Sequence, residues 1–248
     1  MKLKTLTIVS TLVLGTLAVQ SAQAAVALDR TRVIYNGADK SMTVNIQNRN
    51  QNLPYLAQSW VEDAHGKKIS SPMTALPPIQ RLEPGAKSQI KIQGMEAALH
   101  ALPQDRESLY YFNLREIPPK SKKPNTLQIA LQTRIKMFYR PEAIAVKKTD
   151  KPAAESLTLT RSGDSYTIVN PTPYYITIIN ATKGISGQSP KSFKPVMVPP
   201  KSQAPLNVGA SAVGSAPVLT YINDFGGRPK VVFSCGGSTC KVARSEKE

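Results

Sequence analysis

The sequence contains few of the residues on which enzymes and metal centres depend. Its 248 residues include only two histidines, His65 and His100, and two cysteines. His65 lies in an expected turn and His100 in an expected connection, and there is no G-x-S-x-G, H-E-x-x-H or phosphate-binding glycine motif. We therefore expect no catalytic residue, no metal site and no cofactor, and the protein is predicted not to be an enzyme.

Long apolar runs are also scarce, and the one that is present lies at the N-terminus. Residues 1–4 include two lysines, residues 6–19 are mostly apolar, and Ala22 and Ala24 place small side chains where a signal peptidase cuts. The run is too short and too interrupted by Ser and Thr for a membrane-spanning helix of about 20 residues. Residues 1–24 are predicted to be a bacterial signal peptide, cleaved after Ala24, and the exported chain of 248 − 24 = 224 residues is expected not to insert into a membrane.

Acidic residues are half as numerous as basic ones, 16 against 32, which gives a formal net charge of +16. A charge of this sign favours polyanionic partners, so nucleic acid is the strongest alternative on charge alone. The export signal places the protein away from the genome, and the basic residues are scattered without an interleaved aromatic platform. We therefore expect no nucleic acid partner.

The two cysteines, Cys235 and Cys240, lie close together near the C-terminus. Export to an oxidising compartment permits a disulfide, and the four intervening residues, two of them glycine, are able to turn a hairpin. A redox pair normally has two residues between its cysteines, and a structural zinc site requires four ligands, which two cysteines and two distant histidines do not supply. A structural disulfide is favoured over both alternatives.

Helical periodicity is almost absent, and an alternation of apolar and polar side chains takes its place. This alternation is found at residues 42–47, 88–93 and 157–160, and turn sequences rich in Gly, Asp and Pro separate such segments. Residues 94–102 are expected to form no more than a short helical connection. The pattern predicts an all-β chain built of antiparallel sandwiches.

The composition changes between residues 141 and 155, where Lys, Asp, Pro and Ala replace the apolar alternation. We therefore expect one domain at 25–141 and a second at 155–248, joined by a linker at 142–154. The only tryptophan, Trp60, and the adjacent Tyr174 and Tyr175 are expected to pack in the domain cores.

The most informative segment is residues 126–138. Thirteen extended residues span about 43 Å, more than twice the length of a common strand, so part of the segment should extend beyond its own sandwich. Its odd positions are apolar: Leu127, Ile129, Leu131, Ile135 and Met137. The prolines and lysines at 118–124 are typical of a protected sheet edge, which indicates an edge strand. On composition alone, an ordinary core strand behind a solvated basic loop is favoured over a partner-binding strand.

Residues 110–119 and 127–141 resemble the signature of the periplasmic pilus-assembly chaperones. Further similar segments are residues 25–32, 53–58, 80–88, 170–175 and 221–224. The resemblance implies two immunoglobulin-like β-sandwich domains in a boomerang arrangement with an interdomain cleft. It also implies a periplasmic chaperone that binds pilus subunits, both pilins and adhesin, by donor-strand complementation and delivers them to an outer-membrane usher. The short lysine-rich loop before residue 126 is similar to that of chaperones serving thick, rod-like pili.

The same resemblance implies roles for individual residues. Leu127, Ile129 and Leu131 would fill the groove of the subunit. Arg32 and Lys136 would bind the C-terminal carboxylate of the subunit in the cleft. A charge network between the domains would be formed by Glu107, Arg140 and Asp224.

Two further alternatives concern assembly. A surface structural subunit or adhesin would have one sandwich with an N-terminal donor arm, whereas the conspicuous strand lies inside this chain, ahead of a second domain. A self-capping dimer of the unbound protein, formed through its exposed edge, stays open.

Overall fold

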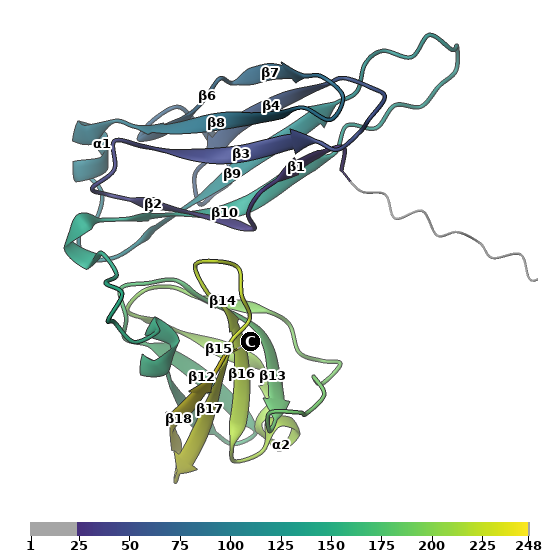
Figure 1. Cartoon of the computed structure of the whole chain (residues 1–248). Coiled ribbons are helices and arrows are strands. Elements are labelled where there is room, and N and C mark those ends of the chain that lie inside the picture. The colour runs from purple at the N-terminus through teal and green to yellow at the C-terminus, as the bar shows by residue number, and fades with distance from the viewer. Residues whose placement is uncertain (1–23, 248) are drawn as a thin grey trace, which may run out of the picture.

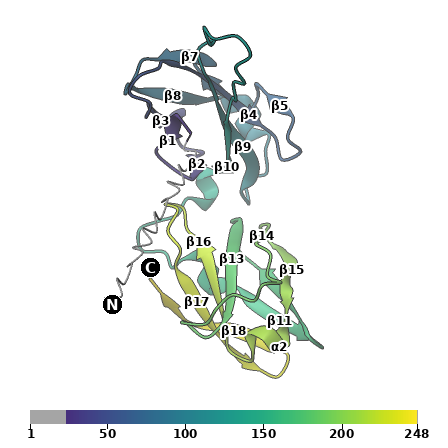
Figure 2. The ribbon, with the colours of Figure 1, turned by 90° about the vertical axis from the view of Figure 1, so that its right-hand side faces the viewer.

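The computed structural model describes residues 24–247, and these form two β-sandwich domains set at an angle to each other (Figures 1 and 2). The predicted all-β fold class is confirmed. The predicted signal peptide lies outside the described residues, apart from Ala24. None of the helices in the described part of the chain is long and apolar enough to cross a membrane.

The N-terminal domain contains two sheets. The first has the strand order β1-β3-β8-β6, formed by Val26–Leu28, Ser41–Asn48, Lys87–Gly94 and Met73–Leu76. The second has the order β2-β10-β9-β4-β5, with β7 also paired to β4; these strands are Arg32–Asn36, Gln132–Arg140, Ser108–Ile117, Tyr55–Glu62, Lys68–Ile69 and Ile79–Leu82. The expected short helix is present as α1, Glu96–His100.

The C-terminal domain is built from one eight-stranded sheet that folds back on itself. Its strand order is β14-β13-β16-β17-β18-β11-β12-β15. In the same order the strands span Val196–Val198, Ile176–Lys183, Pro217–Ile222, Lys230–Gly236, Thr239–Glu246, Thr158–Ser162, Ser165–Asn170 and Ser202–Gly209. A short helix, α2 (Ala210–Val213), follows β15, and the chain between β10 and β11 forms two 3-10 turns, Glu142–Ile144 and Ala153–Ser156.

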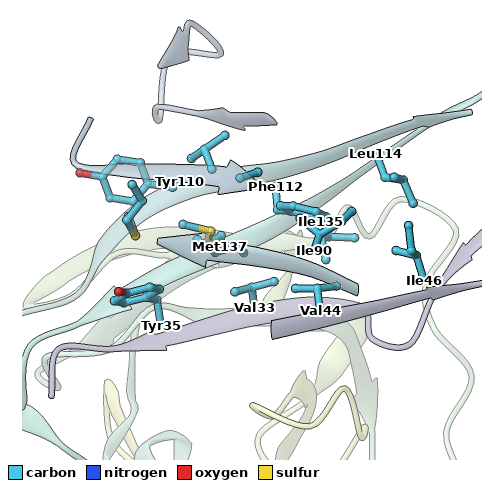
Figure 3. Packing of buried hydrophobic residues seen from close by; sticks show 14 of the residues in the cluster. Val33, Tyr35, Val44, Ile46, Ile90, Tyr110, Phe112, Leu114, Ile135 and Met137 are labelled. Carbon is cyan, nitrogen blue, oxygen red and sulfur yellow. The ribbon is translucent and has the colours of Figure 1, made fainter. Parts of the chain in front are cut away.

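Alternate residues of the N-terminal strands meet between the two sheets. Ile135 and Met137 of β10 point into this core, where they join Val33 and Tyr35 of β2 and Phe112 of β9 (Figure 3). Successive side chains of a strand point to opposite faces. The intervening residues of β2, β9 and β10 therefore lie on the outer face of the second sheet.

Trp60 is buried as expected, with 8% of its surface exposed, but it lies outside the cluster of side chains packed between the two sheets. Ala57 and Val61 of the same strand face the core, so the alternation directs Trp60 to the outer face. The guanidinium carbon of Arg115 lies 5.1 Å from the centre of its ring, and the ammonium of Lys68 lies 5.7 Å away. Cationic side chains, rather than a second sheet, shield this ring from water.

The long strand predicted from residue 126 begins at Gln132. Its neighbour β9 ends at Ile117, and the register that pairs Gln132 with Arg115 leaves residues 126–129 beyond the end of that strand. The expectation of an edge strand is wrong for residues 136–140, which pair with β2 on their other side. Residues 132–135 have a strand partner only in β9, so the edge is confined to the first part of β10.

The predicted disulfide joins Cys235 and Cys240 across the β17–β18 hairpin. Cys240 is buried in the C-terminal core, and Cys235 packs against that core. The bond therefore fastens two neighbouring strands at one end of the C-terminal domain.

Replacing both cysteines with alanine is expected to lower the free energy of unfolding by about 2 kcal/mol, because a short covalent loop no longer restricts the unfolded chain. Urea unfolding of the C235A/C240A protein measures this loss. Reduction of the unmodified protein should give a similar value, and an unchanged urea midpoint after reduction would contradict the stabilising role.

Candidate functional site

Arg32 and Lys136 lie side by side on the outer face of the second sheet. Arg32 is the first residue of β2 and is in register with Lys136 of β10 in the parallel pair. Their chain neighbours Val33, Ile135 and Met137 face the core, which directs both cations outward toward the C-terminal domain. The sequence resemblance alone selected this pair among 32 basic residues.

Both cations are partly desolvated, and neither is neutralised by a carboxylate. Arg32 donates from Nη1 to the carbonyl oxygen of Ile222 at 3.1 Å, and Nζ of Lys136 donates to Oγ1 of Thr177 at 3.2 Å. Arg32 is only 8% exposed, and its Nε has no hydrogen-bond partner. Among residues 24–247, the ion pairs within 4.0 Å include neither side chain.

Burial shifts the pKa of both cations in the same direction. It lowers the pKa of Arg32, and the carboxylates of Asp224 and Glu107 offset only part of this effect. It also lowers the pKa of Lys136, with a further decrease from the neighbouring Arg32. Two adjacent cations that lack a counterion form a site for an anion, and a carboxylate would accept charge-assisted hydrogen bonds from both.

A cavity of about 760 Å³ opens beside Arg32, between the domains, and Lys136 is not part of its lining. Its lining includes Arg32 and Ile34 of β2, Arg140 of β10, and Asp224 and Phe225 of the C-terminal domain. Phe225 is 97% exposed, so a large apolar side chain stands free beside the cations. The site therefore combines positive charge with an apolar wall.

Arg140 binds two carboxylates and connects the domains. Its guanidinium lies 2.7 Å from Oε1 of Glu107 and binds both carboxylate oxygens of Asp224, at 2.7 and 3.1 Å. Glu107 also accepts a hydrogen bond from the backbone N–H of Tyr175 at 2.7 Å, and its own N–H donates to the carbonyl of Pro173. The three charged residues expected to form a network thus lie together, with two backbone contacts that cross between the domains.

The charge network also shifts the pKa values of Arg140 and Glu107. Burial acts to lower the pKa of Arg140, but its two carboxylate partners outweigh burial and raise the pKa above its usual value. Burial raises the pKa of Glu107, and Arg140 offsets part of that rise. Arg140 therefore remains charged, and Glu107 depends on it for its own ionisation.

Two aromatic residues complete the contact between the domains. Phe138 of β10 stacks on Tyr175 with ring centres 5.4 Å apart, and the guanidinium of Arg140 lies 4.9 Å from the ring centre of Tyr174. The expectation that Tyr174 and Tyr175 pack in a core is therefore wrong. They are partly exposed and cover the junction of the domains, where the hydroxyl group of Tyr174 donates to the carbonyl of Ile144 at 2.8 Å.

The segment before β10, residues 125–131, projects from the N-terminal domain (Figure 1). Asn125 turns the chain with a φ of 53°, and Leu127, Ile129 and Leu131 are 84%, 64% and 39% exposed. Within residues 24–247, its backbone contact to a neighbouring strand is the hydrogen bond from the N–H of Glu116 to the carbonyl of Leu131 at 2.9 Å. An extended, apolar and largely unpaired segment is available to pair with another chain.

The comparisons with known proteins agree over both domains. Residues 25–145 match the model of the pili and flagellar-assembly chaperone PapD N-terminal domain, and residues 152–233 match that of the C-terminal domain. The chain belongs to the pilus-assembly chaperone family. Members of this family are periplasmic chaperones and are not enzymes.

Relatives of this chaperone cover nearly its whole length. The probable fimbrial chaperone YfcS of Escherichia coli K12 is 53% identical over 90% of this chain and 87% of its own. The chaperone protein PapD of Escherichia coli is 48% identical over 92% of this chain and 94% of its own.

Two solved structures show the same fold. The periplasmic chaperone SfaE has a TM-score of 0.67 at 32% identity, covering 84% of this chain and 98% of its own. The SafB chaperone from Salmonella enterica, solved in complex with the SafA pilin, has a TM-score of 0.68 at 29% identity and covers 84% and 94%.

Several residues of the chaperone site were missed from sequence. Phe138 interrupts the polar positions of β10, and this break in alternation was the available signal for an apolar contact outside the core. Arg134 lies 2.7 Å from Glu62 and 3.3 Å from the centre of the Tyr111 ring, on the same outer face. Nothing local in the sequence connects these three residues, because their contact depends on the register of β4, β9 and β10.

Replacing Arg140 with methionine should destabilise this chaperone by about 3 to 5 kcal/mol at neutral pH, because Glu107 would be left buried without a cation. Burial already raises the pKa of Glu107, and loss of Arg140 raises it further. Since the folded protein would then bind a proton more tightly than the unfolded chain, the destabilisation should be smaller at pH 5 than at pH 8. Urea unfolding at both pH values measures it.

The matched control is Arg106→Met, which removes an arginine from an exposed pair with Asp105. This variant should leave the urea midpoint unchanged at both pH values, because solvent screens such pairs. An R140M protein that is equally destabilised at pH 5 and pH 8 would contradict the proposed dependence on Glu107.

Proposed function

We propose that this chaperone binds newly exported pilus subunits by donor-strand complementation and delivers them to an outer-membrane usher. The observation that carries the proposal is the exposed apolar segment at 125–131, which leads directly into β10, where Lys136 lies beside Arg32 of β2 on the outer face of the sheet. The crystallised complex of the similar SafB chaperone with the SafA pilin supports a pilin as partner of a protein with this fold.

The donor residues are Leu127, Ile129 and Leu131. They alternate along the segment, so an extended conformation directs all three to the same side. Burying each aliphatic side chain in an apolar groove contributes about 1.5 to 3 kcal/mol before the cost of ordering the segment. The unpaired backbone groups add hydrogen bonds that do not depend on the sequence of the subunit.

The anchor for the subunit's C-terminal carboxylate is formed by Arg32 and Lys136. Nine residues separate Leu127 from Lys136, which corresponds to about 30 Å of extended strand. The donor segment runs toward the anchor, and a subunit chain that ends at the anchor runs in the same direction. The two strands would therefore be parallel, and fixing the terminus would set which groove position meets which donor side chain.

The remaining assignments follow from the same role. We infer that the signal peptide is cleaved after Ala24 and that the domains span 25–141 and 155–248 with a linker at 142–154. The usher is proposed as the next partner because a bound subunit must leave the chaperone to enter a fibre. In the absence of a subunit, the apolar segment is able to pair with that of a second copy, which gives a self-capping dimer.

Replacing Lys136 or Arg32 with alanine is expected to weaken pilin binding by about 1.5 to 3 kcal/mol, a roughly 10- to 150-fold rise in Kd, because one charge-assisted bond to the carboxylate is lost. Titration of the chaperone with a purified pilin displaced from its fibre measures the Kd. Lys122→Ala, which removes an exposed lysine of the preceding loop, is the control and should bind normally.

The same loss should appear when the pilin carries a C-terminal amide in place of its carboxylate. Amidation should weaken binding to the unmodified chaperone and have a smaller effect on K136A, in which only Arg32 remains to bind the carboxylate. If amidation and K136A weaken binding independently, so that their free energies add, the two groups do not interact and the anchor assignment fails.

Replacing Ile129 with serine should leave the chaperone folded, because this side chain is 64% exposed. It should weaken pilin binding by about 1.5 to 3 kcal/mol, since an apolar side chain no longer enters the groove. The control is Ala130→Ser, at the next position and on the opposite side of the segment. Equal binding by I129S and A130S would show that the alternation has no role in recognition.

A further inference from the structure

Glu116 is a buried carboxylate with no cationic partner in the described part of the chain. It lies on β9, two residues after Leu114 of the core, and is only 5% exposed. Its Oε2 accepts a hydrogen bond from the backbone N–H of Val26 at 2.6 Å, and the N–H of Ala25 also donates to this carboxylate. The ion pairs within residues 24–247 do not include it.

An isolated buried carboxylate is unfavourable unless a positive charge compensates it. Burial raises the pKa of Glu116, and the two backbone N–H groups lower it only in part. The neighbouring residues supply no cation: Ala57 is the partner of Glu116 on β4, and Arg49, whose N–H donates to the carbonyl of Ala25, has an exposed side chain. The chemistry of the site therefore calls for an ammonium group at the position of the Ala25 nitrogen.

We propose that Glu116 is the intramolecular binding site for the α-ammonium group of the mature N-terminus at Ala25. This inference depends on the proposed cleavage after Ala24. Hydrolysis adds water across the bond between Ala24 and Ala25, so that Ala24 leaves as a carboxylate and the Ala25 nitrogen becomes a protonated primary amine. The nitrogen that donates to Glu116 as an amide in the full chain then donates to it as a cation.

The pairing would connect three parts of the N-terminal domain. Val26 begins β1, a strand of three residues at the edge of the first sheet, whereas Glu116 belongs to the second sheet. The backbone N–H of Glu116 donates to Leu131 at the end of the apolar segment. One residue thus joins the N-terminus through its side chain and the base of the donor segment through its backbone, so signal peptide removal would strengthen the structure from which that segment projects.

The test is the pKa of the Ala25 α-amine in the exported, processed protein. It is measured from the pH dependence of acetylation by acetic anhydride, with the N-terminal peptide quantified by mass spectrometry. An ordinary α-amine has a pKa of about 7.7 to 8.0, and pairing with Glu116 should raise it by about one unit or more, a roughly tenfold slower acetylation at pH 7. Glu116→Gln should return the pKa to the ordinary range, whereas Glu96→Gln on the exposed first turn of α1 should not change it.

A second variant keeps the test decisive if E116Q does not fold. Two glycines inserted between Ala24 and Ala25 move the amine away from Glu116, and its pKa should then be ordinary. An ordinary pKa in the unmodified processed protein, or a raised pKa that survives either change, would overturn the proposal. Below the ordinary pKa of an α-amine, the ion pair between the Ala25 ammonium and Glu116 should stabilise the folded state fully. Relative to the insertion variant, the unmodified protein should lose this stabilisation as pH rises through the raised pKa of the amine in the folded protein.

The failure of this inference is separable from that of the proposed processing. N-terminal sequencing of the exported protein shows whether Ala25 is its first residue. If it is not, the cleavage assignment is wrong, and the acetylation experiment is repeated on a chain that a sequence-specific protease releases at Ala25. The result with that chain decides the role of Glu116 without reference to the export pathway or to subunit binding.

Discussion

Arg32, Lys136 and Arg140 lie on one face of the second sheet of the N-terminal domain, and the site depends on how unequally the carboxylates are distributed among these three cations. Arg140 binds both Glu107 and Asp224, whereas Arg32 and Lys136 bind only a carbonyl and a hydroxyl group. The pairing of Arg140 holds the C-terminal domain against the sheet, and that contact desolvates the other two cations. The interdomain ion pairs that fix the domains therefore also form the surroundings of the proposed anion site.

In β10 and the segment before it, successive side chains point to opposite sides, so alternate residues have different roles. Ile135 and Met137 complete the core, and the intervening Lys136 and Phe138 face the C-terminal domain. Because a register slip of one residue would exchange these faces, the pairing of β10 with both β2 and β9 protects the core and the cation pair together. The exposed segment has no such constraint on its apolar side chains, since Leu127, Ile129 and Leu131 are exposed and do not pack in the described core of the domain.

Alternation in the sequence was sufficient to predict the all-β class and to place Ile135 and Met137 on the same, apolar side of their strand. It was not sufficient to predict where β10 begins, because that depends on where β9 ends and on a pairing with β2 that is separated by about 100 residues in sequence. The prediction for Trp60 gave more weight to its hydrophobicity than to the alternation of side chains along its strand. Ala57 and Val61 face the core, so Trp60, an odd number of residues from each, faces outward. The roles proposed for Arg32 and Lys136 came from family resemblance, since composition does not distinguish them from the other basic residues.

The structure also explains how the proposed donor segment is able to remain exposed without pairing indiscriminately. Three prolines and three lysines lie between β9 and Asn125, so the chain before the segment lacks several backbone donors and repels like-charged edges. Because Leu127, Ile129 and Leu131 alternate along the segment, a partner would gain apolar contacts with all three only if its groove is open along that length. In the proposed complex, the carboxylate anchor adds a requirement for a chain terminus about 30 Å from the first of these side chains. Backbone pairing alone would accept any exposed strand, so under the proposed function the combination of spacing and charge would confine binding to subunits that end beside their own open groove.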